Sequence, residues 1–171
     1  MKTIVAERLE HKAFEPYGRA IMAGDSAPDI QNDQIDYWDD MADISSLAGQ
    51  GSIGFMRVKK MPIKLGMLQM LHESAELYIT LDGNPSVVFA ALSGADDKPD
   101  LSTLKAFKMD GGQSVVVDKK VWHCTPFTLA DKTDFALLLK NDIIIKNEDG
   151  SFGVDLNTIV YEELAEPFTI E

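Results

Sequence analysis

The chain has 171 residues, of which 45% are hydrophobic and 26% are charged, and these proportions are typical of one soluble globular domain. The formal net charge of −12 disfavours nucleic acid and membrane surfaces as partners, because phosphates and anionic headgroups are neutralised by clustered Lys and Arg. The single cysteine, Cys124, excludes an intrachain disulfide, and the absence of a long apolar run or a signal-peptide pattern leads us to expect a cytoplasmic protein.

The first segment of the chain, up to about residue 40, has the least regular pattern. Its last part, DIQNDQIDYWDD at residues 29–40, is acidic and polar with two aromatic residues. We expect this segment to wrap a barrel or to form an N-terminal arm (about residues 1–40) of a single domain that spans residues 1–171.

Short segments rich in Val, Ile, Phe and Tyr follow one another along the rest of the chain, and turn residues often separate them. They are IGFMRV (53–58), LYITL (77–81), SVVFAAL (86–92), SVVV (114–117), DFALLL (134–139) and DIIIK (142–146). Helical patterns are rare, and we expect only short helical turns at residues 43–48 and 161–165. Many short strands at close spacing predict an all-β sandwich or barrel.

Two histidines and one glutamate form the pattern that carries chemistry. Glu76 follows His72 by four residues, so on an unbroken strand both side chains would point to the same face. His, three residues, Glu, six residues, Gly, ending at Gly83, resembles the second half of a cupin metal motif. VWH, ending at His123, resembles the end of the second cupin motif, although the Pro and Gly of that motif are missing. We therefore expect His123 to face His72 and Glu76 across a small barrel.

This expected set of ligands suits a divalent transition metal. Two imidazoles and a carboxylate, His72, His123 and Glu76, leave coordination positions open for a substrate. Nickel and zinc are the main candidates, with manganese and iron as alternatives. The same residues also have a structural interpretation, in which the histidines pack and hydrogen-bond and the glutamate is solvated. Cys124 should face away from His123 and pack as a small apolar residue.

Several segments resemble one known family. DDKPDLSTLKAF at residues 96–107, VWH at 121–123 and TDF at 133–135 resemble the ureidoglycolate lyase family of allantoin catabolism, also called ureidoglycolate hydrolase. FEPYGRAI at residues 14–21 resembles the opening segment of that family. The resemblance implies an all-β, cupin-like double-stranded β-helix barrel with a few short helical turns. It also implies cleavage of ureidoglycolate to glyoxylate and urea, with a divalent metal that is often given as nickel.

The substrate that the resemblance implies is a small anionic hydroxy acid. Glu76 is the candidate base if it is not a metal ligand. Arg57 resembles a family arginine and is the candidate for a bidentate contact with the substrate carboxylate, although it also has the pattern of a surface strand residue. Lys140 is a second candidate cation.

Three positions depart from the family pattern. Glu76 stands where members carry Gln, Cys124 stands where they often have a second His, and Leu139-Lys140 replaces an acid–arginine pair. These departures keep three alternatives open: a related hydroxy acid as the substrate, a non-catalytic cupin that binds a small acid or sugar, and a cupin sugar isomerase. Exposed strand edges and the N-terminal arm favour a homodimer.

Overall fold

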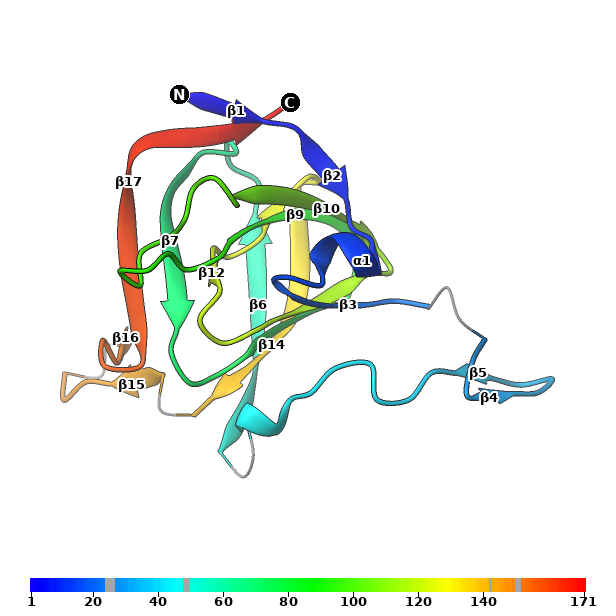
Figure 1. Ribbon diagram of the computed structural model, residues 1–171. Helices are drawn as coiled ribbons and strands as arrows, with labels where there is room; N and C mark the ends of the chain where they lie inside the picture. Colours follow the sequence, from blue (N-terminus) through cyan, green and yellow to red (C-terminus); the bar gives the residue numbers. More distant parts are fainter. Residues whose placement is uncertain (24–26, 48–49, 142, 150–151) are drawn as a thin grey trace.

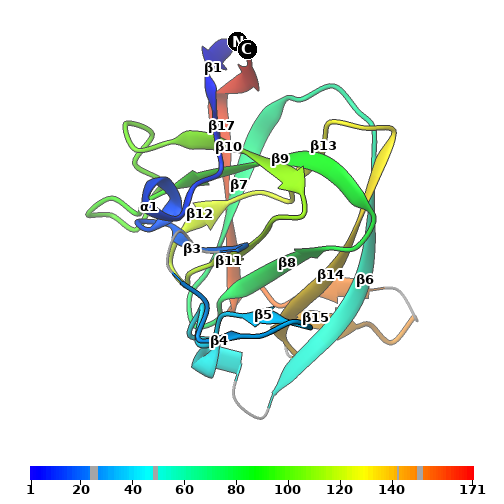
Figure 2. The ribbon, with the colours of Figure 1, turned by 90° about the vertical axis from the view of Figure 1, so that its right-hand side faces the viewer.

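The computed structural model describes residues 1–23, 27–47, 50–141, 143–149 and 152–171. In this part of the chain, two large β-sheets of eight and five strands face each other and enclose the main core (Figures 1 and 2). The two termini lie side by side, because the first strand pairs in parallel with the end of the last one.

The larger sheet has the strand order β1-β17-β7-β12-β9-β10-β2, with β13 paired to β9. The bounds of its strands are Lys2–Ile4 (β1), Ala6–Arg8 (β2), Leu65–Leu71 (β7), Gly83–Ala91 (β9), Lys105–Gly111 (β10), Trp122–His123 (β12), Phe127–Thr128 (β13) and Ile159–Ile170 (β17). The short strand β12 lies between β7 and β9, and its register places His123 opposite Gln69 and Ala90.

The smaller sheet has the strand order β3-β11-β8-β14-β6. The bounds of its strands are Gly18–Ile21 (β3), Gly51–Lys59 (β6), Glu76–Thr80 (β8), Ser114–Val117 (β11) and Lys132–Lys140 (β14). Glu76 is therefore the first residue of the middle strand, at one end of the barrel.

Smaller elements complete the described chain. They are the helix α1 (His11–Phe14), the 3-10 turn η1 (Ser45–Leu47), and two hairpins formed by β4 (Ile30–Gln31) with β5 (Asp36–Tyr37) and by β15 (Ile144–Lys146) with β16 (Phe152–Val154). The β4–β5 hairpin projects away from the two sheets (Figure 1).

The side chains that alternate toward the space between the sheets form the main core. Phe14 and Phe107 meet edge to face with their ring centroids 5.1 Å apart, and Tyr78 meets Phe135 in the same way at 6.1 Å. All four side chains are fully buried. A second cluster lies on the other face of the larger sheet, where Leu68, Phe89 and Trp122 pack under β17 and β1. Because β12 separates two cores, His123 faces the first while Trp122 faces the second.

The structure confirms the expected all-β barrel with a few short helical turns. The strand segments predicted at residues 53–58, 114–117 and 134–139 lie in β6, β11 and β14, and the segment predicted at 86–92 lies in β9 except for its last residue. The expected turn at 43–48 contains η1, while Ala48 and Asp142 of the predicted segments lie outside the described residues.

The helical turn predicted at residues 161–165 is wrong. These residues belong to β17, which pairs with β7 from Ile159 to Glu163 and with β1 near its end. Exposure alternates along Val160 to Leu164 with the period of a strand. Pairing with β7 therefore outweighs the helix propensity of Glu, Leu and Ala.

The single domain with an N-terminal arm remains a prediction, although β1, β2 and β3 of the first segment belong to the two large sheets. No helix in the described ranges is both long and apolar enough to cross a bilayer.

Candidate functional site

A buried carboxylate–imidazole pair lies at one end of the barrel interior. Glu76 Oε2 is 2.7 Å from His123 Nε2, and the side chains of Glu76 and His123 are only 7% and 1% exposed. Glu76 comes from the middle strand of the smaller sheet and His123 from the short strand β12 of the larger one. The pair therefore spans the space between the sheets, as the sequence analysis predicted for these two residues.

Hydrogen-bond chemistry fixes the number of protons on this pair. His123 Nδ1 lies 2.9 Å from the carbonyl oxygen of Val121, which can only accept, so Nδ1 carries a proton and donates it. One further proton then lies between His123 Nε2 and Glu76 Oε2, because two lone pairs at 2.7 Å would repel each other. The pair is thus either imidazolium with carboxylate or neutral imidazole with carboxylic acid.

Gln69 is the third polar member of this group. Its Nε2 atom donates to Glu76 Oε2 over 3.1 Å and lies 3.4 Å from His123 Nε2. The N–H near Oε2 suits a carboxylate, whereas the same amide nitrogen near His123 Nε2 suits an unprotonated nitrogen there. Gln69 therefore links the two side chains without selecting one form of the pair.

Tyr78 lies two residues after Glu76 on β8, so both side chains point into the barrel. Its ring meets the ring of His123 edge to face, with the centroids 6.3 Å apart. Burial, followed by the charge of Glu76, raises the pKa of Tyr78 well above its ordinary value. The phenol therefore keeps its proton and remains a hydrogen-bond donor.

Two cavities reach this group from different sides. One, of about 150 Å³, is lined by Glu76, Gln69, Thr125 and Tyr161 and by a wall of aliphatic side chains that includes Leu139. The other, of about 270 Å³, shares Gln69 and Thr125 and adds Lys64, Cys124 and apolar residues such as Met67. A small polar ligand in the first cavity would meet the carboxylate of Glu76, and a lysine borders the second cavity.

His72, the third predicted metal ligand, lies apart from the pair. The strand β7 ends at Leu71, and His72 occupies a bend whose backbone N–H donates to Thr158. Because the chain turns before β8 begins, the even spacing of His72 and Glu76 no longer places them on one face. Within the described ranges, no three His, Cys, Asp or Glu side chains are grouped so that they could hold a metal ion. The residues present do not fit a three-ligand metal centre, so we derive no step through a metal.

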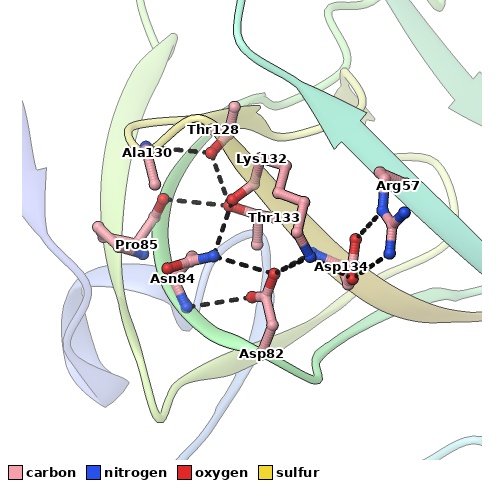
Figure 3. Close-up of polar contacts among 9 residues, drawn as sticks. All are labelled: Arg57, Asp82, Asn84, Pro85, Thr128, Ala130, Lys132, Thr133 and Asp134. Atoms are coloured by element: carbon pink, nitrogen blue, oxygen red, sulfur yellow. Dashed lines mark hydrogen bonds and ion pairs between the residues drawn. The ribbon is translucent and has the colours of Figure 1, made fainter.

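Arg57 lies on the outer face of the smaller sheet. Its strand neighbours Met56 and Val58 pack against the main core, so Arg57 points to the opposite side. Its Nε and Nη2 atoms donate to the two carboxylate oxygens of Asp134 over 2.7 and 2.8 Å (Figure 3). Arg57 is therefore engaged by a protein carboxylate and is not among the described residues that line either cavity.

Asp134 is the centre of a polar network that joins three strand ends. Lys132 Nζ lies 2.7 Å from Asp134 Oδ2, and the backbone N–H of Asp134 donates to Asp82 over 2.9 Å. Asn84 donates to the same Asp82 oxygen and to the backbone carbonyl of Lys132 (Figure 3). Hydrogen bonds from Arg57, and then from Lys132, hold the pKa of Asp134 far below its usual range. The network ties β14 to β6 and to the turn before β9.

Replacing Asp134 with Asn should lower the free energy of unfolding near neutral pH. The pKa of Asp134 is depressed in the folded state, so its stabilising effect is complete above the unfolded pKa of about 4 and is lost as the pH falls toward the folded value. The stability difference between parent and variant should therefore shrink in acid. Urea unfolding at several pH values measures it, with Asp131→Asn, whose side chain is 98% exposed, as the control. A difference that is as large at pH 2 as at pH 7 contradicts this explanation.

Lys140 and Cys124 lie at the edge of the site. Lys140 Nζ is 3.8 Å from Glu73, and Lys140 does not line either of the two cavities, although its neighbour Leu139 lines the smaller one. Cys124 packs against the second core cluster, and burial raises the pKa of its thiol to about 12. The thiol therefore remains protonated and is a poor nucleophile.

The sequence analysis missed Gln69, Lys64 and Thr125. A signal for Gln69 was present, since it is the one polar side chain in LGMLQML at residues 65–71. An amide among apolar neighbours on a strand needs a buried hydrogen-bond partner, and Glu76 provides it. No local signal marks Lys64 or Thr125, because a cavity forms from segments that are distant in the sequence.

Comparison with known proteins gives consistent results. The sequence model of the family described as ureidoglycolate lyase matches residues 1–168. Relatives named ureidoglycolate lyase from Salmonella paratyphi B and Salmonella typhimurium are each 31% identical over 160 residues, which covers 91% of this chain and 94% of theirs.

Two solved structures overlap the chain partially. RmlC from Streptococcus suis, in complex with dTDP-D-xylose, is 13% identical with a TM-score of 0.41 and covers 54% of this chain and 44% of its own. A dTDP-4-dehydrorhamnose 3,5-epimerase from Elizabethkingia anophelis is 14% identical with a TM-score of 0.40. The match covers 60% of this chain and 54% of the epimerase chain. Overlap of this extent carries no argument about activity.

Proposed function

The chain belongs to the ureidoglycolate lyase family, and from this membership we propose that it cleaves ureidoglycolate to glyoxylate and urea. The observation that carries the proposal is the buried Glu76–His123 pair, which shares one proton and borders a cavity of about 150 Å³. The reaction needs a group that can both accept and return a proton. This pair meets that requirement.

The reaction moves one proton within the substrate. Ureidoglycolate carries a hydroxyl group and a ureido nitrogen on the same carbon. Removing the hydroxyl proton lets the oxygen form the carbonyl of glyoxylate, while the bond from carbon to nitrogen breaks and its electron pair leaves with the nitrogen. The nitrogen then takes up a proton to give urea. Base and acid catalysis are thus both required, and the net change in protons is zero.

Glu76 is the residue that we assign to both transfers. It lines the smaller cavity, and its contacts with His123 and Gln69 both fall on Oε2. Oε1 is therefore the oxygen assigned to take the hydroxyl proton. The resulting carboxylic acid returns that proton to the departing nitrogen, so Glu76 ends the cycle as it began.

His123 and Gln69 act on Glu76 as positioning residues. Both contact Oε2 and so fix the orientation of the carboxyl group. Because Val121 holds His123 Nδ1, the imidazole ring has one orientation.

A small anionic substrate fits this proposal if a local cation offsets the acidic surface. Lys64 borders the larger cavity, which shares Gln69 and Thr125 with the smaller one. We assign Lys64 to the carboxylate of the substrate, which places the hydroxyl-bearing carbon near Glu76. Lys64 takes this role instead of Arg57, because Arg57 lies on the outer face of the smaller sheet and Asp134 engages its Nε–Nη2 edge.

The direct test is a urea-release assay of the purified full-length protein with ureidoglycolate. We expect formation of urea and glyoxylate in equal amounts. Binding of ureidoglycolate without urea release would instead favour a non-catalytic cupin. Failure to bind it at all would overturn the proposal.

Metal dependence remains a prediction of the sequence analysis. If the chain works with nickel or zinc, the native protein should contain a stoichiometric ion, and chelation should abolish urea release. Elemental analysis before and after dialysis measures this. His72→Ala then decides the ligand set: unchanged metal content would show that His72 is not a ligand. The cytoplasmic location and the homodimer remain predictions as well.

A further inference from the structure

One buried hydroxyl group beside the cavity has no hydrogen-bond partner within the described chain. Tyr78 is fully buried, and its Oη atom accepts and donates no hydrogen bond there. Leaving a buried polar group unsatisfied costs free energy, and native structures seldom do so without a reason. Tyr17 shows the usual arrangement, since its hydroxyl donates to the carbonyl oxygen of Thr103 over 2.6 Å.

The surroundings of the Tyr78 hydroxyl are those of the proposed active site. Glu76 and Thr125 lie close enough for side-chain contacts that shift the pKa of this hydroxyl, upward and downward respectively, but neither contact has the distance and angle of a hydrogen bond. Both residues line the smaller cavity, whereas Tyr78 itself does not. Tyr78 shares its strand face with Glu76, and its ring contacts the ring of His123. An unused donor therefore lies beside the carboxylate that we assign as the base.

We propose that the Tyr78 hydroxyl donates a hydrogen bond to the substrate oxygen that loses its proton to Glu76. This inference rests on the proposed lyase function and adds a second catalytic residue to it. As the proton leaves, negative charge develops on that oxygen before the carbon–nitrogen bond has fully broken. A fixed donor in a dry site stabilises such charge more in the transition state than in the ground state. No bond to Tyr78 forms or breaks, so the proton balance of the reaction is unchanged.

Tyr78→Phe removes only the hydroxyl group and therefore tests this role. We expect kcat for urea release to fall about 100-fold, the effect typical of removing one donor to a developing oxyanion, while KM changes little. The thermal unfolding midpoint of the ligand-free variant should stay the same or rise, because an unsatisfied buried group has been removed. If the hydroxyl had a purely structural role, its removal would lower the unfolding midpoint and leave kcat unchanged.

Two control variants calibrate the readouts. Ser86→Ala removes another buried hydroxyl without a partner, and Ser86 lies opposite Met109 and Thr128 in the larger sheet rather than on the strand of Glu76, so stability should hold and kcat should stay unchanged. Tyr17→Phe removes a satisfied phenol, so the midpoint should fall while kcat is retained.

The outcomes separate this inference from the proposed function. If the parent releases urea and Tyr78→Phe does so at the same kcat, the inference is overturned and the proposed function stands. If the parent releases no urea, the proposed function fails, and calorimetry with glyoxylate then tests the contact itself. At least tenfold weaker glyoxylate binding by Tyr78→Phe would support the contact; equal binding, or no binding by the parent, would overturn it.

Discussion

Replacing Glu76 with Gln should reduce kcat/KM for ureidoglycolate by a factor of about 10² to 10⁴, the range that general acid–base catalysis contributes. The amide has the size of the carboxylate and can still hydrogen-bond to His123 and Gln69, so the barrel should remain folded. What it cannot do is accept the hydroxyl proton of the substrate. Steady-state urea release measures the loss, and circular dichroism verifies the fold.

The control for this variant is Glu10→Gln, which changes an exposed glutamate before α1 and should leave kcat/KM unchanged. Glu76→Gln also tests the departure from the family pattern, because Glu76 stands where the family resemblance places an amide. An active Glu76→Gln variant would show that the base lies elsewhere and that this chain works as amide-bearing members do. An inactive one would show that this chain carries its own base.

Replacing His123 with Ala should destabilise the protein by about 3–5 kcal/mol, the usual result when one partner of a buried ion pair is removed. The carboxylate of Glu76 would remain in an apolar interior with only Gln69 as a hydrogen-bond partner. A cavity would also open next to Tyr78 and Ala90. Equilibrium unfolding in urea measures the change.

Two further variants isolate the electrostatic part of that loss. His72→Ala removes a half-exposed imidazole outside the pair and should change stability by less than about 0.5 kcal/mol. Adding Glu76→Gln to His123→Ala should restore part of the stability, because an amide costs less to bury than a carboxylate. If His123→Ala unfolds at the same urea concentration as the parent, the pair is not desolvated as its exposure indicates.

The pattern of apolar and turn residues along the sequence predicted most strands correctly, but it led to two wrong predictions. Residues 161–165 have helix-forming side chains, and only the pairing of β17 with β7 makes them part of a strand. His72 and Glu76 have the spacing of one strand face, yet the bend after Leu71 separates them. In both cases a rule based on neighbouring residues was overruled by contacts with distant ones.

The sequence by itself determined the fold class and the family, because alternating apolar residues, turn signals and short motifs are local properties. Only the tertiary structure decided that Glu76 and His123 form a hydrogen-bonded pair and which residues surround it. Gln69 reaches Glu76 through the order of strands in the larger sheet, and Arg57 meets Asp134 across 77 positions of the chain. Side-chain period assigns a residue to a face, whereas register and strand order decide what lies opposite it. Arg57 was therefore recognisable as a strand residue, and the outer face was one of its two interpretations, but its contact with Asp134 was not foreseeable.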